Sequence, residues 1–168
     1  MIISKYLMLA ILSMNVYNCD GVRLPRTETQ IGEAVVHKFL LPNGSITSGF
    51  YAIDYKIGTT DIIAYRGTDD GSDVIAWQQF LGSPYSTQGQ QALQFYKDVN
   101  GGSLAFNSNI VLTGHSLGGG LAGWVAGHTG TGAVAFDNNG FEQAIAAKYE
   151  GLAVTTGLFA ARITACAR

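Results

Sequence analysis

The 168-residue chain is poor in charged side chains, proline and cysteine. Charged residues make up 13% of the sequence, about half of the ~25% of an ordinary soluble domain. The 10 basic residues do not outnumber the 12 acidic ones, which disfavours a protein that binds nucleic acid through a basic surface. No run of 18 apolar residues occurs, so no ordinary membrane span is predicted. Hydrophobic residues reach 47%, which excludes a disordered chain.

The two cysteines, Cys19 and Cys166, lie near opposite ends of the chain. A disulfide framework in so short a chain needs more cysteines, so we expect two free thiols. A metal site needs clustered ligands, and His37, His115 and His128 are too widely spaced in sequence to indicate a ligand set. Neither a metal nor a cofactor is therefore expected.

The first 20 residues fit two descriptions. Lys5 and the apolar stretch after it resemble the start of a secretory signal, but no small-x-small cleavage site follows. A stripe at helical spacing instead favours a helix of the mature chain, and its members are Ile3, Leu7, Ala10, Met14 and Tyr17. A cytoplasmic and a secreted location both stay open.

The length suits a single domain over residues 1–168. Residues 20–45 are interpreted as loop-like because Pro25, Pro42 and an Asn43-Gly44 turn interrupt them. Strands are predicted at 46–57 and 61–65, forming a hairpin, and at 110–113 and 133–136. Helices are predicted at 73–81, from 86 or 87 to about 99, at 117–127 and at 141–149. The alternation of strands and helices in the second half of the chain predicts an α/β fold with a mainly parallel sheet.

The motif that carries chemistry is Gly-His-Ser-Leu-Gly-Gly-Gly at residues 114–120. Gly-x-Ser-x-Gly between a strand and a helix describes a nucleophile elbow, in which a tight, strained turn lifts the hydroxyl of Ser116 out of the sheet. The flanking glycines allow the strand and helix backbones to approach without Cβ collisions. The amide after the serine is then directed at the position where an oxyanion forms.

The same glycines allow a rival interpretation. Gly118-x-Gly120-x-x-Gly123 satisfies the dinucleotide fingerprint, and Asp137 follows at the distance of a ribose-binding acid. The position of the motif in the chain disfavours the dinucleotide interpretation. Such a fingerprint opens the first strand–helix unit of its domain, and here 113 residues precede the motif. No Tyr-x-x-x-Lys pair follows either.

The chain resembles the class 3 lipase-like family of α/β hydrolases. The resemblance is carried by Ile-Ala-Tyr-Arg-Gly-Thr at residues 63–68, a following helix with Trp77, and residues 112–119, and it covers roughly residues 6–140. It implies that Ser116 is the nucleophile and that the backbone amides of Thr68 and Leu117 form the oxyanion hole. Asp137 is a candidate for the triad acid, although a turn residue is the simpler interpretation of that position.

The base is not found in the sequence. In this fold the order is serine, acid, histidine, and only His128 follows Ser116. Twelve residues of helix place it about 18 Å away. His115 is expected to be a packing residue, and His37 violates the usual order. We therefore expect the family's histidine, and its acid as well, to lie beyond residue 168, leaving the C-terminal strands missing and a sheet edge exposed to self-association.

Three functions follow. The first is a lipase- or esterase-type serine hydrolase that acts on a small ester or lipid through an acyl-enzyme on Ser116. The second is a catalytically incomplete remnant of such a hydrolase. The third is a dinucleotide-binding oxidoreductase that uses the Gly118–Gly123 turn. No nucleic-acid partner is expected for any of them.

Overall fold

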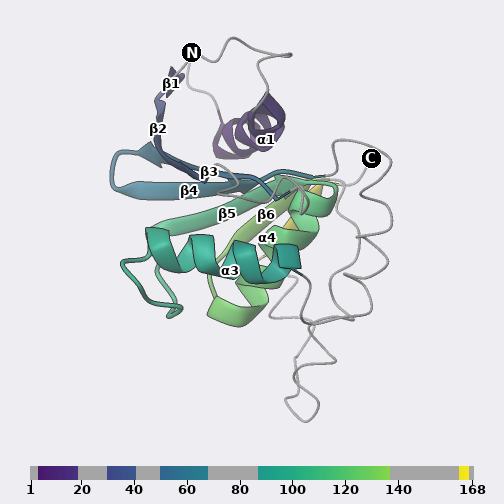
Figure 1. The fold of residues 1–168 in the computed structure, drawn as a ribbon. Coiled ribbons are helices and arrows are strands. Elements are labelled where there is room, and N and C mark those ends of the chain that lie inside the picture. The colour runs from purple at the N-terminus through teal and green to yellow at the C-terminus, as the bar shows by residue number, and fades with distance from the viewer. Residues whose placement is uncertain (1–3, 19–29, 41–49, 68–86, 137–162, 167–168) are drawn as a thin grey trace.

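The computed structural model describes residues 4–18, 30–40, 50–67, 87–136 and 163–166 (Figure 1). These residues form a sheet with helices on both faces, which confirms the predicted α/β class. The helices are α1 (Lys5–Asn15), a short 3-10 helix η1 (Val16–Asn18), α3 (Thr87–Val99) and α4 (Leu117–Thr129). The strands are β1 (Gln30–Ile31), β2 (Ala34–Leu40), β3 (Ala52–Ile57), β4 (Thr60–Tyr65), β5 (Ile110–His115), β6 (Ala133–Phe136) and β7 (Ile163–Cys166).

The sheet has the strand order β1-β2-β3-β4-β5-β6-β7 and is divided into two halves. Strands β1 to β4 pair antiparallel, whereas β4 to β7 pair parallel. The β3–β4 hairpin closes through Gly58 and Thr59, with Ile57 paired to Thr60, and Gly58 adopts the positive φ of 57° that this tight turn requires. The predicted hairpin is confirmed.

The sheet separates two hydrophobic cores (Figure 1). Alternate side chains of β5 point to opposite faces of the sheet. Ile110 and Leu112 belong to the core under α3 and α4, whereas Val111 packs on the core under α1. Thr113 points to the α1 side, where its hydroxyl donates to the Val134 carbonyl at 2.9 Å. Burial on both faces explains why this strand is a short apolar run in the sequence.

Helix α1 forms as predicted, but it buries a different stripe. Leu7 and Met14 of the predicted stripe are 53% and 52% exposed. The residues of α1 that are buried in the core beneath it are Met8, Leu9 and Leu12, and Val16 and Tyr17 of η1 join them, so Tyr17 of the predicted stripe is buried. The helix is apolar on nearly every side, so periodicity alone does not select the face that the sheet covers.

Helices α3 and α4 cover the opposite face of the sheet (Figure 1). Almost all of α4 is buried, and it ends at Gly130, whose φ of 74° is the left-handed conformation of a glycine C-cap. The loop from α3 to β5 is held by asparagine side chains, since Asn107 donates to Asn100 and accepts from the Asn109 amide. Among the described residues no helix has the length and apolarity to cross a membrane.

Three sequence predictions are corrected or left untested by the fold. Residues 30–31 and 34–40 form β1 and β2, so the interpretation of 20–45 as wholly loop-like is wrong there. Strand β7 pairs parallel with β6 in a tail for which no strand was predicted. The predicted helices at 73–81 and 141–149 lie outside the described residues.

Candidate functional site

Ser116 occupies the turn between β5 and α4, at the carboxyl end of a parallel strand. Its φ of 55° and ψ of −124° make it the single non-glycine residue with positive φ in the described part of the chain. A non-glycine residue in such a conformation costs about 1–3 kcal/mol. Two backbone hydrogen bonds hold the turn: the Ser116 amide donates to the Phe136 carbonyl at 3.0 Å, and its carbonyl accepts from Gly120 at 3.1 Å.

The glycines on either side of Ser116 allow an unusually close approach of three backbones. A Cβ atom on Gly114 would lie 2.3 Å from the carbonyl group of Gly118. A Cβ atom on Gly118 would lie 2.1 Å from the carbonyl oxygen of Tyr65 in β4. Both positions are therefore restricted to glycine by backbone atoms that do not yield as a flexible side chain would. The first turn of α4 is thereby fixed against β4 and β5.

Leu117 is the first residue of α4. The first four amides of an α-helix have no acceptor within the helix, so the Leu117 N–H is not used by the helix itself. Thr68, the other predicted oxyanion residue, lies outside the described residues, and so does Asp137.

Gly67, the residue before Thr68, is described and buried. A Cβ atom there would lie 2.6 Å from the His115 carbonyl oxygen and 2.1 Å from the Tyr17 hydroxyl oxygen. The backbone that leaves β4 therefore passes directly against the residue that precedes Ser116.

His115 faces the α1 side of the sheet. The Tyr17 hydroxyl lies 3.1 Å from its Nδ1 and donates to its backbone carbonyl at 3.2 Å. The two rings meet edge to face with centroids 6.0 Å apart. His115 is thus a partly buried packing residue, as predicted, and it ties the end of β5 to the N-terminal helical segment.

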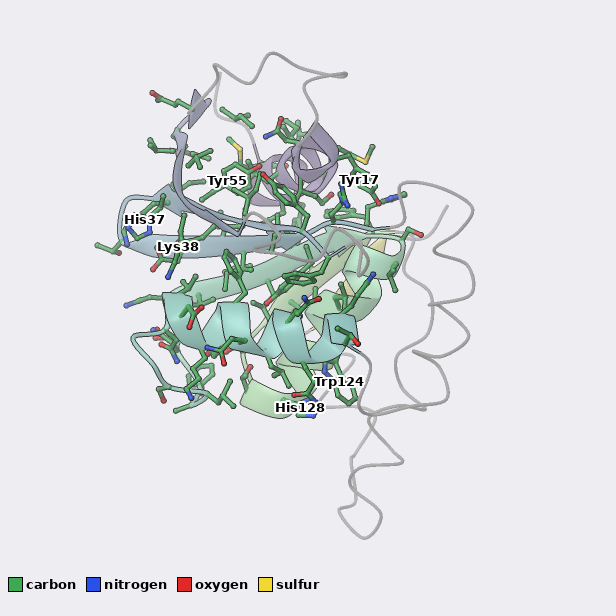
Figure 2. All side chains as sticks on the ribbon, viewed as in Figure 1. Tyr17, His37, Lys38, Tyr55, Trp124 and His128 are labelled. Carbon is green, nitrogen blue, oxygen red and sulfur yellow. The ribbon has the colours of Figure 1, made fainter. Side chains whose placement is uncertain are left out.

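The other two histidines lie far from this turn (Figure 2). His128 is in the last turn of α4, where its Nδ1 donates to the Trp124 carbonyl at 2.8 Å and its ring contacts the Trp124 ring at 4.0 Å between centroids. Helix α4 is unbroken from Leu117, so the predicted separation of about 18 Å between His128 and Ser116 holds. His37 lies on β2 in the antiparallel half of the sheet.

The dinucleotide interpretation requires its first two glycines in the turn that precedes a helix. Gly118, Gly120 and Gly123 all lie inside α4 and are buried. The close contact of Gly118 with Tyr65 leaves no room for a pyrophosphate between that glycine and β4. The geometry therefore disfavours this alternative.

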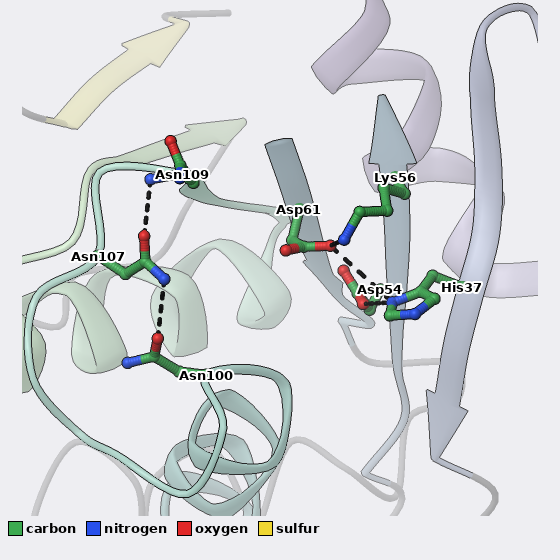
Figure 3. Close-up of polar contacts among 7 residues, drawn as sticks. All are labelled: His37, Asp54, Lys56, Asp61, Asn100, Asn107 and Asn109. Atoms are coloured by element: carbon green, nitrogen blue, oxygen red, sulfur yellow. Dashed lines mark hydrogen bonds and ion pairs between the residues drawn. The ribbon is translucent and has the colours of Figure 1, made fainter. Parts of the chain in front are cut away.

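A polar cluster that the sequence did not reveal lies in the antiparallel half of the sheet (Figure 3). His37 Nδ1 donates to Asp54 Oδ2 at 2.9 Å and lies 3.9 Å from Asp61 Oδ1, while Lys56 Nζ donates to Asp61 Oδ1 at 2.8 Å. Burial raises the pKa of Asp54 to about 6, and the hydrogen bond from His37 opposes this only in part. The partners are 17 residues apart in sequence, and only the strand register brings them together.

Comparison with known proteins shows the family of this chain. The model of a phospholipase-like family, the Tle-like phospholipase domain, matches residues 8–166. The extracellular phospholipase A1 of Serratia liquefaciens is 30% identical over 138 residues, which are 79% of this chain and 41% of that protein. The chain thus spans less than half the length of this curated relative. The predicted lipase-like hydrolase family is confirmed, and the chain belongs to the family of Tle-like phospholipase domains.

Proposed function

We propose that this domain cleaves a carboxylic ester bond of a glycerophospholipid through an acyl-enzyme on Ser116. The observation that carries the proposal is the conformation of Ser116. Its backbone holds a strained φ of 55° between a parallel strand and a buried helix, at a position restricted by Gly114 and Gly118. Strain of this kind persists where the surrounding structure fixes it, and it is concentrated at functional sites.

In the proposed reaction the Ser116 Oγ forms a bond to the ester carbonyl carbon and loses its proton to a base. The carbonyl oxygen gains the negative charge of the tetrahedral intermediate. Collapse of that intermediate breaks the bond to the alcohol oxygen, which takes up a proton and leaves as the lysophospholipid. Water then releases the fatty acid by the same steps.

The amides of Leu117 and Thr68 would stabilise the oxyanion. Support comes from the place of Leu117 at the start of α4 and from the contact of Gly67 with the His115 backbone, which brings the chain entering Thr68 toward Ser116. Two preorganised donors act on charge that develops only in the transition state, and one such donor is typically worth a factor of about 10²–10³ in rate.

The proton acceptor is the part of the reaction that the described residues do not provide. His115 is bonded to Tyr17, His128 to the Trp124 carbonyl and His37 to Asp54. Asp137 as the triad acid stays a proposal. Because none of these histidines is placed to act as the base, the second candidate function is a catalytically incomplete remnant. Such a remnant keeps the fold and the serine turn but does not turn over substrate.

A fluorophosphonate probe, which forms a covalent bond only with an activated serine, distinguishes the two candidates. We expect labelling at Ser116, located by peptide mass spectrometry, and its loss in Ser116→Ala. Ser103→Ala is the matched control, because Ser103 is an exposed serine in the α3–β5 loop. Hydrolysis of phospholipid in mixed micelles should follow the labelling. A protein with a normal melting transition and no labelling would be the remnant.

A further inference from the structure

The polar cluster defined by His37, Asp54, Lys56 and Asp61 lies at the opposite end of the sheet from Ser116. Asp61 pairs with Ile110 at the start of the parallel half, whereas Ser116 follows the end of the same strand β5. A β-bulge between Val36 and Lys38 interrupts the pairing of β2 with β3, and His37 is the bulged residue. Bulges of this kind redirect a side chain, and here the His37 ring reaches Asp54.

We propose that His37, Asp54 and Asp61 bind a divalent transition-metal ion of the Zn²⁺ type. Each residue offers one ligand atom, and these atoms all lie within 4.8 Å of one another. A tetrahedral ion with bonds of about 2.1 Å holds its ligands about 3.4 Å apart. The observed separations of 2.9 Å from His37 Nδ1 to Asp54 Oδ2 and 3.9 Å from His37 Nδ1 to Asp61 Oδ1 bracket this value.

A second observation, independent of the bonds within the cluster, points to a cation as the ligand of Asp54. The Asp54 side chain is fully buried, and its Oδ1 has no hydrogen-bond partner among the described residues. The Asp54 carboxylate lies between His37 and the Asp61–Lys56 pair (Figure 3). A buried carboxylate oxygen without a partner loses its hydration and gains nothing in return. A metal ion bound through Oδ2 supplies positive charge to the buried carboxylate whose second oxygen, Oδ1, has no hydrogen-bond partner among the described residues.

The donor set selects the class of ion. One imidazole nitrogen with two carboxylate oxygens suits Zn²⁺ or a similar transition metal better than Ca²⁺ or Mg²⁺, which prefer oxygen ligands throughout. Three protein ligands leave a fourth position to water. His37 is 55% exposed, so the site opens to solvent on that side and offers an entry path. On binding, His37 Nδ1 exchanges its proton for the metal.

The ammonium group of Lys56 competes with a metal ion for the Asp61 carboxylate. Its ammonium group is 2.8 Å from Asp61 Oδ1, and the side chain is 41% exposed, so it can move into solvent when an ion enters. If the cluster serves only as an internal ion pair, loss of Lys56 has no favourable consequence for metal binding. If it is a metal site, Lys56→Met removes a competing cation and strengthens Zn²⁺ binding.

Titration calorimetry with ZnCl₂ on the chain after removal of metal with EDTA tests the proposal. We expect one site per chain, a rise of the melting temperature with Zn²⁺, and at least a tenfold weaker Kd in Asp54→Asn and in His37→Gln, about the lower limit for loss of a group that supports a metal. Lys56→Met should bind Zn²⁺ more tightly. Asp98→Asn is the matched control, because Asp98 is an exposed aspartate outside the cluster that accepts from Gln94.

The absorption spectrum of Co²⁺ bound to the unsubstituted chain reports the type of ligand. This measurement does not depend on the stability of the variants. Its visible bands should appear without the near-ultraviolet charge-transfer band of a thiolate ligand, since Cys19 and Cys166 are not in the proposed site. No binding at millimolar Zn²⁺, binding unchanged in both ligand variants, or a thiolate band would each overturn the proposal. None of these outcomes depends on Ser116 chemistry, so the site and the proposed hydrolase fail or succeed separately.

Discussion

The backbone conformation of Ser116 makes a prediction about stability that is unusual for a functional serine. Ser116→Ala keeps the Cβ atom and therefore keeps the strain of φ 55°, about 1–3 kcal/mol. Ser116→Gly removes that strain, but glycine has more freedom in the unfolded chain, which costs about 0.5–1 kcal/mol relative to alanine. The glycine variant should therefore be the more stable of the two by about 1 kcal/mol.

Urea denaturation followed by circular dichroism measures this difference directly, and thermal melting gives a second value. For a chain of this length, 1 kcal/mol corresponds to a rise in Tm of about 2–4 °C. Neither variant has the hydroxyl, so both should lose fluorophosphonate labelling while their stabilities differ. The loss of reaction is then separated from any loss of folding.

The matched control is the same pair of substitutions at Ser103, an exposed loop residue whose φ is not positive. There the order should reverse, with Ser103→Gly less stable than Ser103→Ala, because only the unfolded-state term operates. If Ser116→Ala proves more stable than Ser116→Gly by about 0.5–1 kcal/mol, as expected at Ser103, residue 116 carries no backbone strain. The conformational evidence for a nucleophile at this position would then be lost.

Two further predictions concern other positions. Gly118→Ala places a Cβ atom 2.1 Å from the Tyr65 carbonyl oxygen and should destabilise the fold by about 1–3 kcal/mol or more, whereas Gly132→Ala enters open space and should be tolerated. The pKa of Asp54 is about 6 in the native state against an ordinary 3.8, so the native state binds the proton more tightly and the free energy of unfolding falls as pH rises through this interval. The difference between the two pKa values corresponds to about 3 kcal/mol of unfolding free energy. In the presence of EDTA, Asp54→Asn should not show this fall in stability with pH. An identical fall in the variant would show that Asp54 is not the titrating group.

The parallel half of the sheet could be predicted from local sequence because its elements have distinct patterns. The apolar runs at 110–113 and 133–136 are largely buried, and the glycine-rich turn after the first run is followed by a stretch compatible with a helix. The structure places β6 at Ala133–Phe136 and begins α4 at Leu117, both as predicted.

Other features could not be predicted because tertiary contacts decide them. The segment Ala34–Leu40 becomes a strand by pairing with β3, although prolines and a turn flank it in sequence. Helix α1 is apolar on both sides, and only the position of the sheet determines that Leu9 is buried and Leu7 exposed. The His37–Asp54 contact depends on the register of two strands and on a bulge, neither of which periodicity reveals.

Strand β4 connects the two candidate sites and determines how they can influence each other. Asp61 lies near its start, and Gly67 follows its end, about 20 Å away at the rise of an extended strand. At physiological ionic strength the Debye length is about 8 Å, so the charge of a metal ion at Asp61 would be largely screened at Ser116. The ion could act there only by stabilising β4 against the first turn of α4. Zn²⁺ should therefore raise the melting temperature without changing the pH dependence of Ser116 labelling.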